Sequence, residues 1–364
     1  MGGAGGLAGC LGDEPDALLW SIDDDVRDAG WALADGTMYV STGDASDGDI
    51  RAIDAETGAE EWSFSYENGM SHGRWFVRDG LLFAVLTIAG TGHDSHLLAI
   101  DADGGHVEWS DIRLRSLSYP VYDDGTVFAP GGERDDVDVQ VIDAETGDVH
   151  ASVELSDDIS NAFADNIAVT EDAVYGFVRQ IDDPAGQKVH AKSRSFRSTY
   201  WEVDAEPYGT NLERPVVDDD TVYFASEVGV FALDAETGSE RWLFQQRGRP
   251  SMPVLSGETL CVSRGDSIQV FDTETGTQRW STDVESNRPA VGEHAVYTVG
   301  GDGNVVALDI ETGEERWRTT INDDRPIIGD GEDRFRHGCR IWNGKLYAIS
   351  MDGTAYAFDP EVTA

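Results

Sequence analysis

The sequence has few basic residues, few cysteines and no helical pattern of any length. Its 26 lysines and arginines stand against 70 aspartates and glutamates, so the net charge is −44 at pH 7, and only three of the bases are lysines. Because nucleic acid requires a basic face for its phosphates, this balance argues against binding to DNA or RNA. A surface this acidic repels itself in dilute buffer and is screened at molar salt, which is typical of an extreme halophile.

An eleven-residue phrase recurs along the chain and is its most regular feature. In each copy an Asp is followed eight residues later by a Trp, in the pairs Asp54/Trp62, Asp101/Trp109, Asp234/Trp242, Asp272/Trp280 and Asp309/Trp317. A sixth copy keeps Asp143 and its turn but has Ala151 where the Trp is expected. Such repetition indicates one structural unit made many times.

A second column of the repeat marks the first strand of each unit, in segments such as WALADGTMY and PVVDDDTVY. It contains Trp31, Trp75, Pro120, Ile167, Pro215, Pro253, Pro289 and Cys339, at spacings of 36 to 50 residues. Asp-Gly between alternating apolar runs predicts tight hairpins. Four strands per unit at this period are typical of propeller blades, so the sequence predicts eight blades.

The ends of the chain predict how the ring closes. The eighth unit stops without a fourth strand carrying a Trp, whereas the segment ALLWSID provides such a strand, with Trp20, before the first unit. We therefore predict an all-β, eight-bladed propeller of four-stranded antiparallel blades, closed by the N-terminal strand, so that no sheet edge stays open. We expect residues 16–364 to form this single domain.

The phrase A-x-D-x-x-T-G-x-x-x-W resembles the tryptophan-docking repeat of quinoprotein-type (PQQ-like) β-propellers. The resemblance covers nearly the whole chain and implies a structural docking role for Trp20, Trp62, Trp109, Trp242, Trp280 and Trp317. The family includes dehydrogenases that hold pyrroloquinoline quinone and calcium. It also includes cofactor-free members such as the propeller lipoprotein of the outer-membrane β-barrel assembly machinery.

The resemblance allows the enzyme alternative to be tested against the residues. Quinone-dependent dehydrogenases of the family typically use a pair of adjacent cysteines, whereas the three cysteines here, Cys10, Cys261 and Cys339, are far apart in sequence. The paired histidines of the loop GTGHDSH are weak evidence for a metal. We therefore expect no catalytic residue, no metal and no cofactor, and we expect Cys261 and Cys339 to be buried thiols.

The N-terminus favours the cofactor-free branch. Residues 7–10 read LAGC, which resembles the lipobox at which a lipoprotein signal is cut and the new N-terminal Cys is lipidated. We interpret residues 1–15 as the remnant of such a signal followed by an acidic tether, with Cys10 as the lipidated residue. The membrane would then be reached only through this lipid, on the extracytoplasmic face of the cell membrane.

Two departures from the repeat are candidates for binding. In blade four the usual phrase is replaced by a basic segment containing Lys188, His190, Lys192, Arg194 and Arg197. It is either a surface for an unidentified protein partner or an elongated hairpin whose bases pair with acids of neighbouring blades.

The second departure is a set of arginines at or just before the first strands of blades. They are Arg74, Arg214, Arg249, Arg288 and Arg336. Because first strands line the central channel of a propeller, these arginines predict either an anion site at one mouth of the channel or simple charge balance with nearby acids. The sequence thus favours a monomeric, non-catalytic protein-binding scaffold. The alternatives are a PQQ-dependent oxidoreductase and a binder of an anionic ligand or polysaccharide at the channel.

Overall fold

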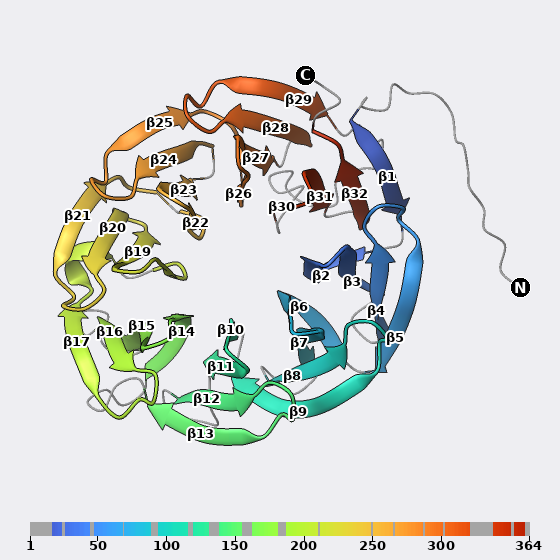
Figure 1. The fold of residues 1–364 in the computed structure, drawn as a ribbon, viewed down its shortest axis with the longest axis horizontal. Coiled ribbons are helices and arrows are strands. Elements are labelled where there is room, and N and C mark those ends of the chain that lie inside the picture. The colour runs from blue at the N-terminus through green and yellow to red at the C-terminus, as the bar shows by residue number, and fades with distance from the viewer. Residues whose placement is uncertain are drawn as a thin grey trace, which may run out of the picture.

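A computed structural model places most of the chain in one ring of strands (Figure 1). It describes residues 17–23, 26–43, 47–67, 69–88, 94–115, 119–130, 138–154, 162–180, 187–209, 212–248, 250–264, 266–286, 288–300, 303–320, 338–350 and 353–360.

The described strands form eight four-stranded antiparallel sheets, one for each predicted blade. Blade one contains β2 (Val26–Ala34), β3 (Thr37–Gly43), β4 (Asp47–Asp54) and β5 (Glu60–Glu67). Blade two contains β6 (Gly69–Arg78), β7 (Leu81–Ile88), β8 (Asp94–Asp101) and β9 (Val107–Arg115). Blade three contains β10 (Val121–Asp123), β11 (Thr126–Pro130), β12 (Asp138–Asp143) and β13 (Val149–Glu154). Blade four contains β14 (Ala162–Val169), β15 (Ala173–Gln180), β16 (Lys188–Ser193) and β17 (Thr199–Asp204).

The second half of the ring follows the same pattern after a short 3-10 helix, η2 (Glu206–Tyr208). Blade five contains β18 (Val216–Val217), β19 (Thr221–Ser226), β20 (Gly229–Asp234) and β21 (Glu240–Gln245). Blade six contains β22 (Val254–Ser256), β23 (Thr259–Ser263), β24 (Ile268–Asp272) and β25 (Gln278–Thr282). Blade seven contains β26 (Ala290–Val291), β27 (Ala295–Val299), β28 (Asn304–Asp309) and β29 (Glu315–Thr320). Blade eight contains β30 (Cys339–Trp342), β31 (Lys345–Ile349), β32 (Thr354–Phe358) and, from the other end of the chain, β1 (Leu18–Asp23).

The ring closes as the sequence predicts. Strand β1 pairs antiparallel with β32, with Trp20 opposite Ala357, and it forms the outer strand of the last blade. The backbone N–H of Asp359 also donates to the carbonyl of Ala17 (2.8 Å). The eight-bladed architecture and the closure by the N-terminal strand are therefore confirmed.

The core consists of eight separate hydrophobic clusters, each lying between two neighbouring blades. Strand β23, with the sequence TLCVS, packs against a neighbouring blade on each of its two faces. Leu260 and Val262 pack toward blade five, whereas Cys261 between them packs toward blade seven. Since side chains alternate along a strand, an inner strand enclosed by two neighbouring blades is apolar on both faces rather than on alternate positions.

The repeated phrase forms a turn that we call the docking turn, running from the Asp to the Gly of each copy. In blade one it spans residues 54–58, where Asp54 Oδ1 accepts from the backbone N–H and the hydroxyl of Thr57 (2.7 and 2.6 Å). The same two bonds recur in the turns of blades three, five, six and seven. A carboxylate that caps its own turn explains why the sequence repeats Asp and Thr three residues apart.

In six of the eight blades the tryptophan of the outer strand lies on the docking turn of the next blade. The Trp62 indole donates to Ala102 O (2.8 Å), and the Trp109 indole donates to Ala144 O (2.9 Å). The corresponding donors in other blades are Trp20, Trp201, Trp242 and Trp280. At Gly147 a β-carbon would come within 2.7 Å of the Trp109 ring, and its φ is 75°. The turn therefore requires glycine both for its backbone conformation and for the indole that covers it.

Trp317 differs from the other docking tryptophans. It packs in the cluster with Phe358 of blade eight, and its ring centroid lies 6.5 Å from that of Tyr297. The described part of blade eight contains no docking turn, and its fourth strand comes from the N-terminus. Among the described residues the Trp317 indole therefore has no turn carbonyl to which it can donate.

The boundary between blades three and four is built differently, because Ala151 replaces the docking Trp. Here the turn after β16 reaches back to blade three. Arg194 forms an ion pair with Asp123, donates to the Asp123 carbonyl (2.8 Å) and lies over the Phe128 ring (5.3 Å). Phe196, held at a φ of 58°, packs against the same ring at a centroid distance of 6.3 Å. An arginine and a phenylalanine of blade four thus make the contact that a tryptophan makes elsewhere.

Candidate functional site

The basic segment of blade four is largely enclosed. Strand β16 is an inner strand, and His190 and Lys192 are only 1% and 3% exposed. Lys188 forms an ion pair with Glu202 on the neighbouring strand β17, and a nitrogen of His190 lies 3.4 Å from the same carboxylate. Burial therefore removes His190 and Lys192 from any surface that a partner can reach.

Of the two remaining basic residues of that segment, one is part of the fold and the other is accessible to solvent. Arg194 is engaged with blade three, as described above, whereas Arg197 is exposed. Three residues further along, Tyr200 is 50% exposed. The accessible part of the hairpin is thus its tip and the outer strand β17, not the inner strand β16.

The arginines expected near the channel are described only in part. Arg249, Arg336 and the lipidation residue Cys10 lie outside the described residues, and the structure describes the backbone but not the side chain of Arg74. Arg288 precedes β26, and its Nη2 donates to the hydroxyl of Tyr119, at the start of blade three (3.0 Å). Blades three and seven lie on opposite sides of the ring, so this bond crosses the ring axis (Figure 1).

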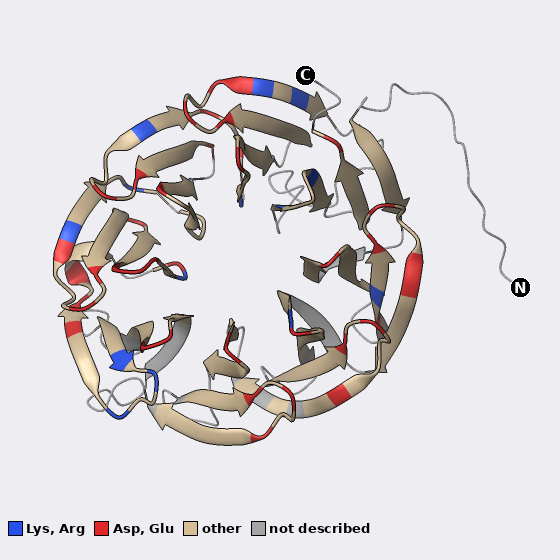
Figure 2. Ribbon diagram, viewed as in Figure 1, with Lys and Arg blue, Asp and Glu red and all other residues tan. Residues whose placement is uncertain are grey.

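A second arginine at the axis, Arg340, is not among those that the sequence indicates. The N–H of Cys339 donates to Arg288 O (3.4 Å), which holds the two arginines side by side in blades seven and eight. Arg340 Nη2 donates to Trp31 O (3.1 Å), and its guanidinium lies 4.7 Å from the centroid of that indole. Figure 2 shows Lys and Arg segments near the centre of the ring at β26 and β30.

The environment of these guanidiniums is unfavourable for charge. Burial, together with the positive charges of Arg288 and Arg78, lowers the pKa of Arg340 to about 10. Burial also lowers the pKa of Arg288 and Arg214. In the described part of the chain none of Arg214, Arg288 and Arg340 forms an ion pair.

Arginines on the outer strands show the opposite behaviour. Arg241, Arg279 and Arg316 each lie seven residues after a docking-turn Asp and bind its carboxylate at 2.8 Å. The hydrogen bond from Arg241 lowers the pKa of Asp234 to about 2. These pairs belong to the repeat and stabilise the turn, so they are not candidates for binding a ligand.

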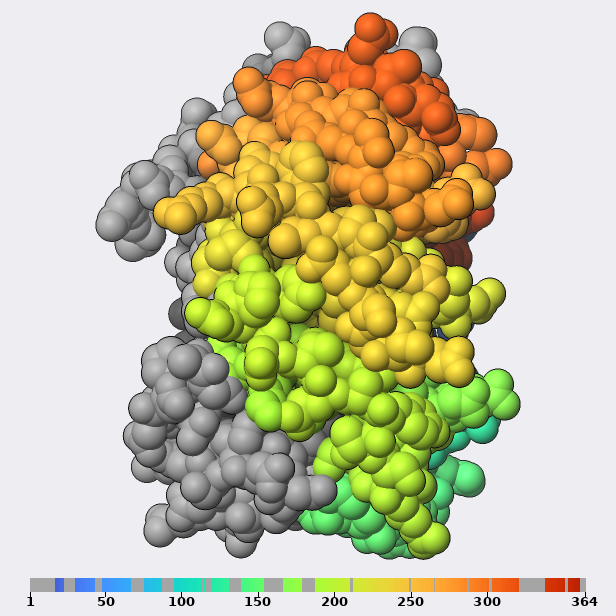
Figure 3. All heavy atoms as spheres, turned by 90° about the vertical axis from the view of Figure 1, so that its left-hand side faces the viewer, coloured from blue at the N-terminus to red at the C-terminus, as the bar shows by residue number. Residues whose placement is uncertain are grey.

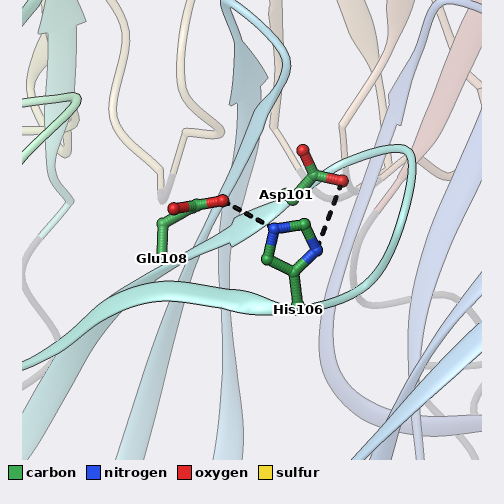
Figure 4. Close-up of side chains that lie close together, drawn as sticks. All are labelled: Asp101, His106 and Glu108. Atoms are coloured by element: carbon green, nitrogen blue, oxygen red, sulfur yellow. Dashed lines mark ion pairs between the residues drawn. The ribbon is translucent and has the colours of Figure 1, made fainter.

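Blade two carries a group that could hold a metal ion, formed by Asp101, His106 and Glu108 (Figure 4). His106 lies between the two carboxylates, 3.7 Å from Asp101 and 2.7 Å from Glu108. One imidazole and two carboxylates are a donor set that Zn²⁺ accepts. Glu108 stands seven residues after Asp101, where blades five to seven have arginine, and His106 is the basic side chain that lies beside the turn Asp instead.

A cleft of about 500 Å³ adjoins this group between blades two and three. Its lining consists of Arg78, Asp79, Leu81, Glu108, Tyr122, Gly125, Asp143, Ala144 and Glu145. The Tyr122 hydroxyl donates to the Asp79 carboxylate. Burial, and after it this hydrogen bond, raises the pKa of Tyr122. Four carboxylates against one arginine make the cleft more suitable for a cation than for an anion.

The two described cysteines are free and buried. Burial raises the pKa of the Cys339 thiol to about 12 and raises that of Cys261 as well. Since the thiolate is the reactive form of cysteine, neither residue is suited to nucleophilic or redox chemistry in the folded protein. As for membrane contact, the described residues include no helix with the length and apolarity that a transmembrane span needs.

These features define a class: an eight-bladed propeller of PQQ-like repeats whose tryptophans and docking turns join successive blades. Comparison with known families agrees. The sequence model described as outer membrane protein assembly factor BamB matches residues 5–179 and 185–362. The chain therefore belongs to this family of BamB-type, PQQ-like propellers.

Solved structures share the fold at low sequence identity. The chain is similar to BamB from Moraxella catarrhalis (17% identity, TM-score 0.65), with 94% of this chain and 97% of the other covered. It is also similar to the computationally designed protein Ika8 (14%, TM-score 0.70, coverage 94% and 99%). A europium-containing methanol dehydrogenase has the same fold (12%, TM-score 0.63, coverage 93% and 84%). Among curated proteins, no sequence matches the chain.

Sequence reasoning missed Arg340 and the group around His106. Arg340 follows the column residue Cys339 instead of preceding it, so a search for arginine before each first strand passes over it. Glu108 was detectable, because an alignment of the repeats places it where Arg241 stands in blade five. The signal in both cases is a residue of unexpected charge at a fixed position of the repeat.

Proposed function

We propose that this protein is a lipid-anchored propeller on the extracytoplasmic face of the membrane that acts as a non-catalytic scaffold for a protein partner. The observation that supports it best is the match of nearly the whole chain to a family described by an outer-membrane assembly factor. The LAGC sequence supports anchoring through Cys10. The dispersed cysteines support a role without quinone chemistry.

The partner surface that fits best is the outer rim of blades three and four. Val149 on β13 and Tyr200 on β17 are 51% and 50% exposed, and they are two of three large hydrophobic side chains exposed among the described residues. Figure 3 shows blade four, in lime, forming the outer wall between blade five and the green residues of blade three. In molar salt, where charge attraction is screened, apolar contacts must carry much of the affinity, and Arg197 would add preference for an acidic partner.

The scaffold proposal is tested by purifying the tagged full-length protein from its membranes in molar KCl and identifying stoichiometric companions. The double variant Arg197→Ser/Tyr200→Ser should lose the companion without a change in melting temperature, because both side chains are exposed. Leu19→Ser is the matched control, since Leu19 is 42% exposed on β1, across the ring in blade eight. Retention of the companion by the double variant would rule out this surface, and the absence of any companion would rule out the scaffold.

Two further measurements separate the parts of the proposal. Cys10→Ser should release the protein from the membrane fraction, and continued membrane association would refute the lipid anchor. Adding pyrroloquinoline quinone and calcium to the purified protein should produce no bound chromophore. A stoichiometric chromophore that persists through gel filtration would establish the oxidoreductase alternative in place of the scaffold.

A further inference from the structure

The axis of the ring holds two arginines, Arg288 and Arg340, that form no ion pair among the described residues. With 70 acidic and 26 basic residues, carboxylates are available almost everywhere, and the outer arginines of blades five to seven each bind one. Arg288 and Arg340, which are only partly exposed, bind none in the described part of the chain. The negative charge of Glu213 acts on Arg288 without an ion pair between the two. Withdrawing a guanidinium from water without a directly paired counter-charge is costly, so such a pair of arginines favours an anion.

The two guanidiniums are held in place by their neighbours. Arg288 is fixed by its bond to Tyr119 across the axis, and a β-carbon on Gly338 would collide with the Arg288 backbone, which shows how closely blades seven and eight approach there. Arg340 is fixed by the carbonyl and the ring face of Trp31. Donors held in advance bind an oxyanion better than flexible ones, because less conformational entropy is lost.

Two indoles on the innermost strands also lack acceptors. The indole nitrogens of Trp31 and Trp75 are buried and have no hydrogen-bond partner among the described residues. Both residues lie on innermost strands, β2 and β6, and are 2% and 3% exposed. Buried N–H groups are nearly always paired, so these two indoles are donors that an added acceptor would satisfy.

We propose that the ring axis is a binding site for a small oxyanion, whose carboxylate or phosphate oxygens pair with Arg288 and Arg340. Guanidinium is the group best suited to bind these oxygens in pairs. The ligand is small because the bond between Arg288 and Tyr119 already spans the axis. Positive charge inside an acidic ring also makes the site selective, since anions are repelled from the rest of the surface.

The test is isothermal titration of the full-length protein with citrate and, separately, with inorganic phosphate, at an ionic strength held constant with KCl. We expect saturable binding of one of these probes at one site per chain. Arg288→Gln should weaken it about tenfold to a hundredfold, because a charge-assisted hydrogen bond is lost. Arg318→Gln is the matched control: it removes the same charge from the outer strand β29, where Arg318 binds Glu315, and it should leave the affinity unchanged.

Each outcome decides the proposal. A response to citrate alone identifies a carboxylate ligand, and a response to phosphate alone identifies a phosphate ligand. No saturable binding of either probe refutes the site, as does equal affinity of the wild type and Arg288→Gln. Equal weakening by Arg288→Gln and Arg318→Gln shows general charge attraction and also refutes it. Arg340→Gln is a second variant, and its loss of affinity counts if its melting temperature shows that the protein still folds without the contact between Arg340 and Trp31.

Discussion

Replacing one docking tryptophan by alanine measures how much the contact between blades contributes to stability. Trp242 joins blade five to blade six. Its side chain is 8% exposed, its indole N–H donates to Thr273 O (2.9 Å), and its ring lies against Gly276 and, at a centroid distance of 6.0 Å, Tyr223. Trp242→Ala removes all of these contacts. The small alanine cannot fill the space, because the docking turn is fixed by its own hydrogen bonds.

The expected loss of stability follows from the buried area. An aromatic side chain removes about 150–250 Å² from water, which at about 25 cal/mol per Å² is worth about 4–6 kcal/mol as an upper bound. Measured Trp-to-Ala losses in cores are about 3–5 kcal/mol, so we expect about 4 kcal/mol. With an unfolding entropy of about 2.1 cal/mol/K for each of 364 residues, the melting temperature should fall by about 5 °C.

The assay is thermal unfolding in molar KCl, where the repulsion between carboxylates is screened. Trp242→Phe should fall between wild type and Trp242→Ala, since it keeps most of the apolar area and loses the hydrogen bond. Arg318→Ala, which removes an exposed ion pair with Glu315, should change the melting temperature by less than about 1 °C. A fall of less than about 1 °C for Trp242→Ala would refute the docking role.

Three further predictions concern the boundary of blades three and four, pH and salt. Arg194→Met should destabilise the fold by about 2–3 kcal/mol, because it leaves Asp123 without its partner. The control Arg197→Met should stay within about 0.5 kcal/mol of the wild-type stability, because Arg197 is exposed. Equal melting temperatures of the two variants would contradict the contact between Arg194 and Asp123. The pKa of Asp234, lowered from 3.8 to about 2 by Arg241, means that this pair stabilises above pH about 4 and that its contribution disappears as the pH falls toward 2. The difference in melting temperature between wild type and Arg241→Gln should therefore shrink over that interval, and a constant difference would show that the pair does not depend on the charge of Asp234. Finally, the melting temperature of the wild type should rise from dilute buffer to molar KCl, and a flat profile would refute the halophilic assignment.

Local sequence accounts for most of the fold. The docking turn is determined within five residues, because Asp54 caps it through Thr57 and the glycine that ends it accepts a positive φ. Alternation within strands determines which residues face each neighbouring blade, as in β23. The count of eight and the closure by β1 follow from the repeats, since the segment with Trp20 and the incomplete last unit have no other partners of their kind.

What the repeat pattern does not determine is how its irregular positions compensate for one another. In sequence, Ala151 and the turn with Arg194 are separate departures from the repeat, and the turn looks like a basic surface. In three dimensions they lie on the two sides of one boundary, where Arg194 and Phe196 replace the missing indole contact.

The contacts at the ring axis also cannot be predicted from local sequence, because they join residues that are far apart in the chain. Arg288 and Tyr119 are 169 residues apart, and they meet only because opposite blades face each other across the ring. Arg340 reaches Trp31 only because the last blade closes against the first. Local hydrogen bonding and strand alternation act over a few residues, so the sequence alone determined the blades and their order. The curvature of the whole ring decided which side chains share the axis, and with them the candidate binding site.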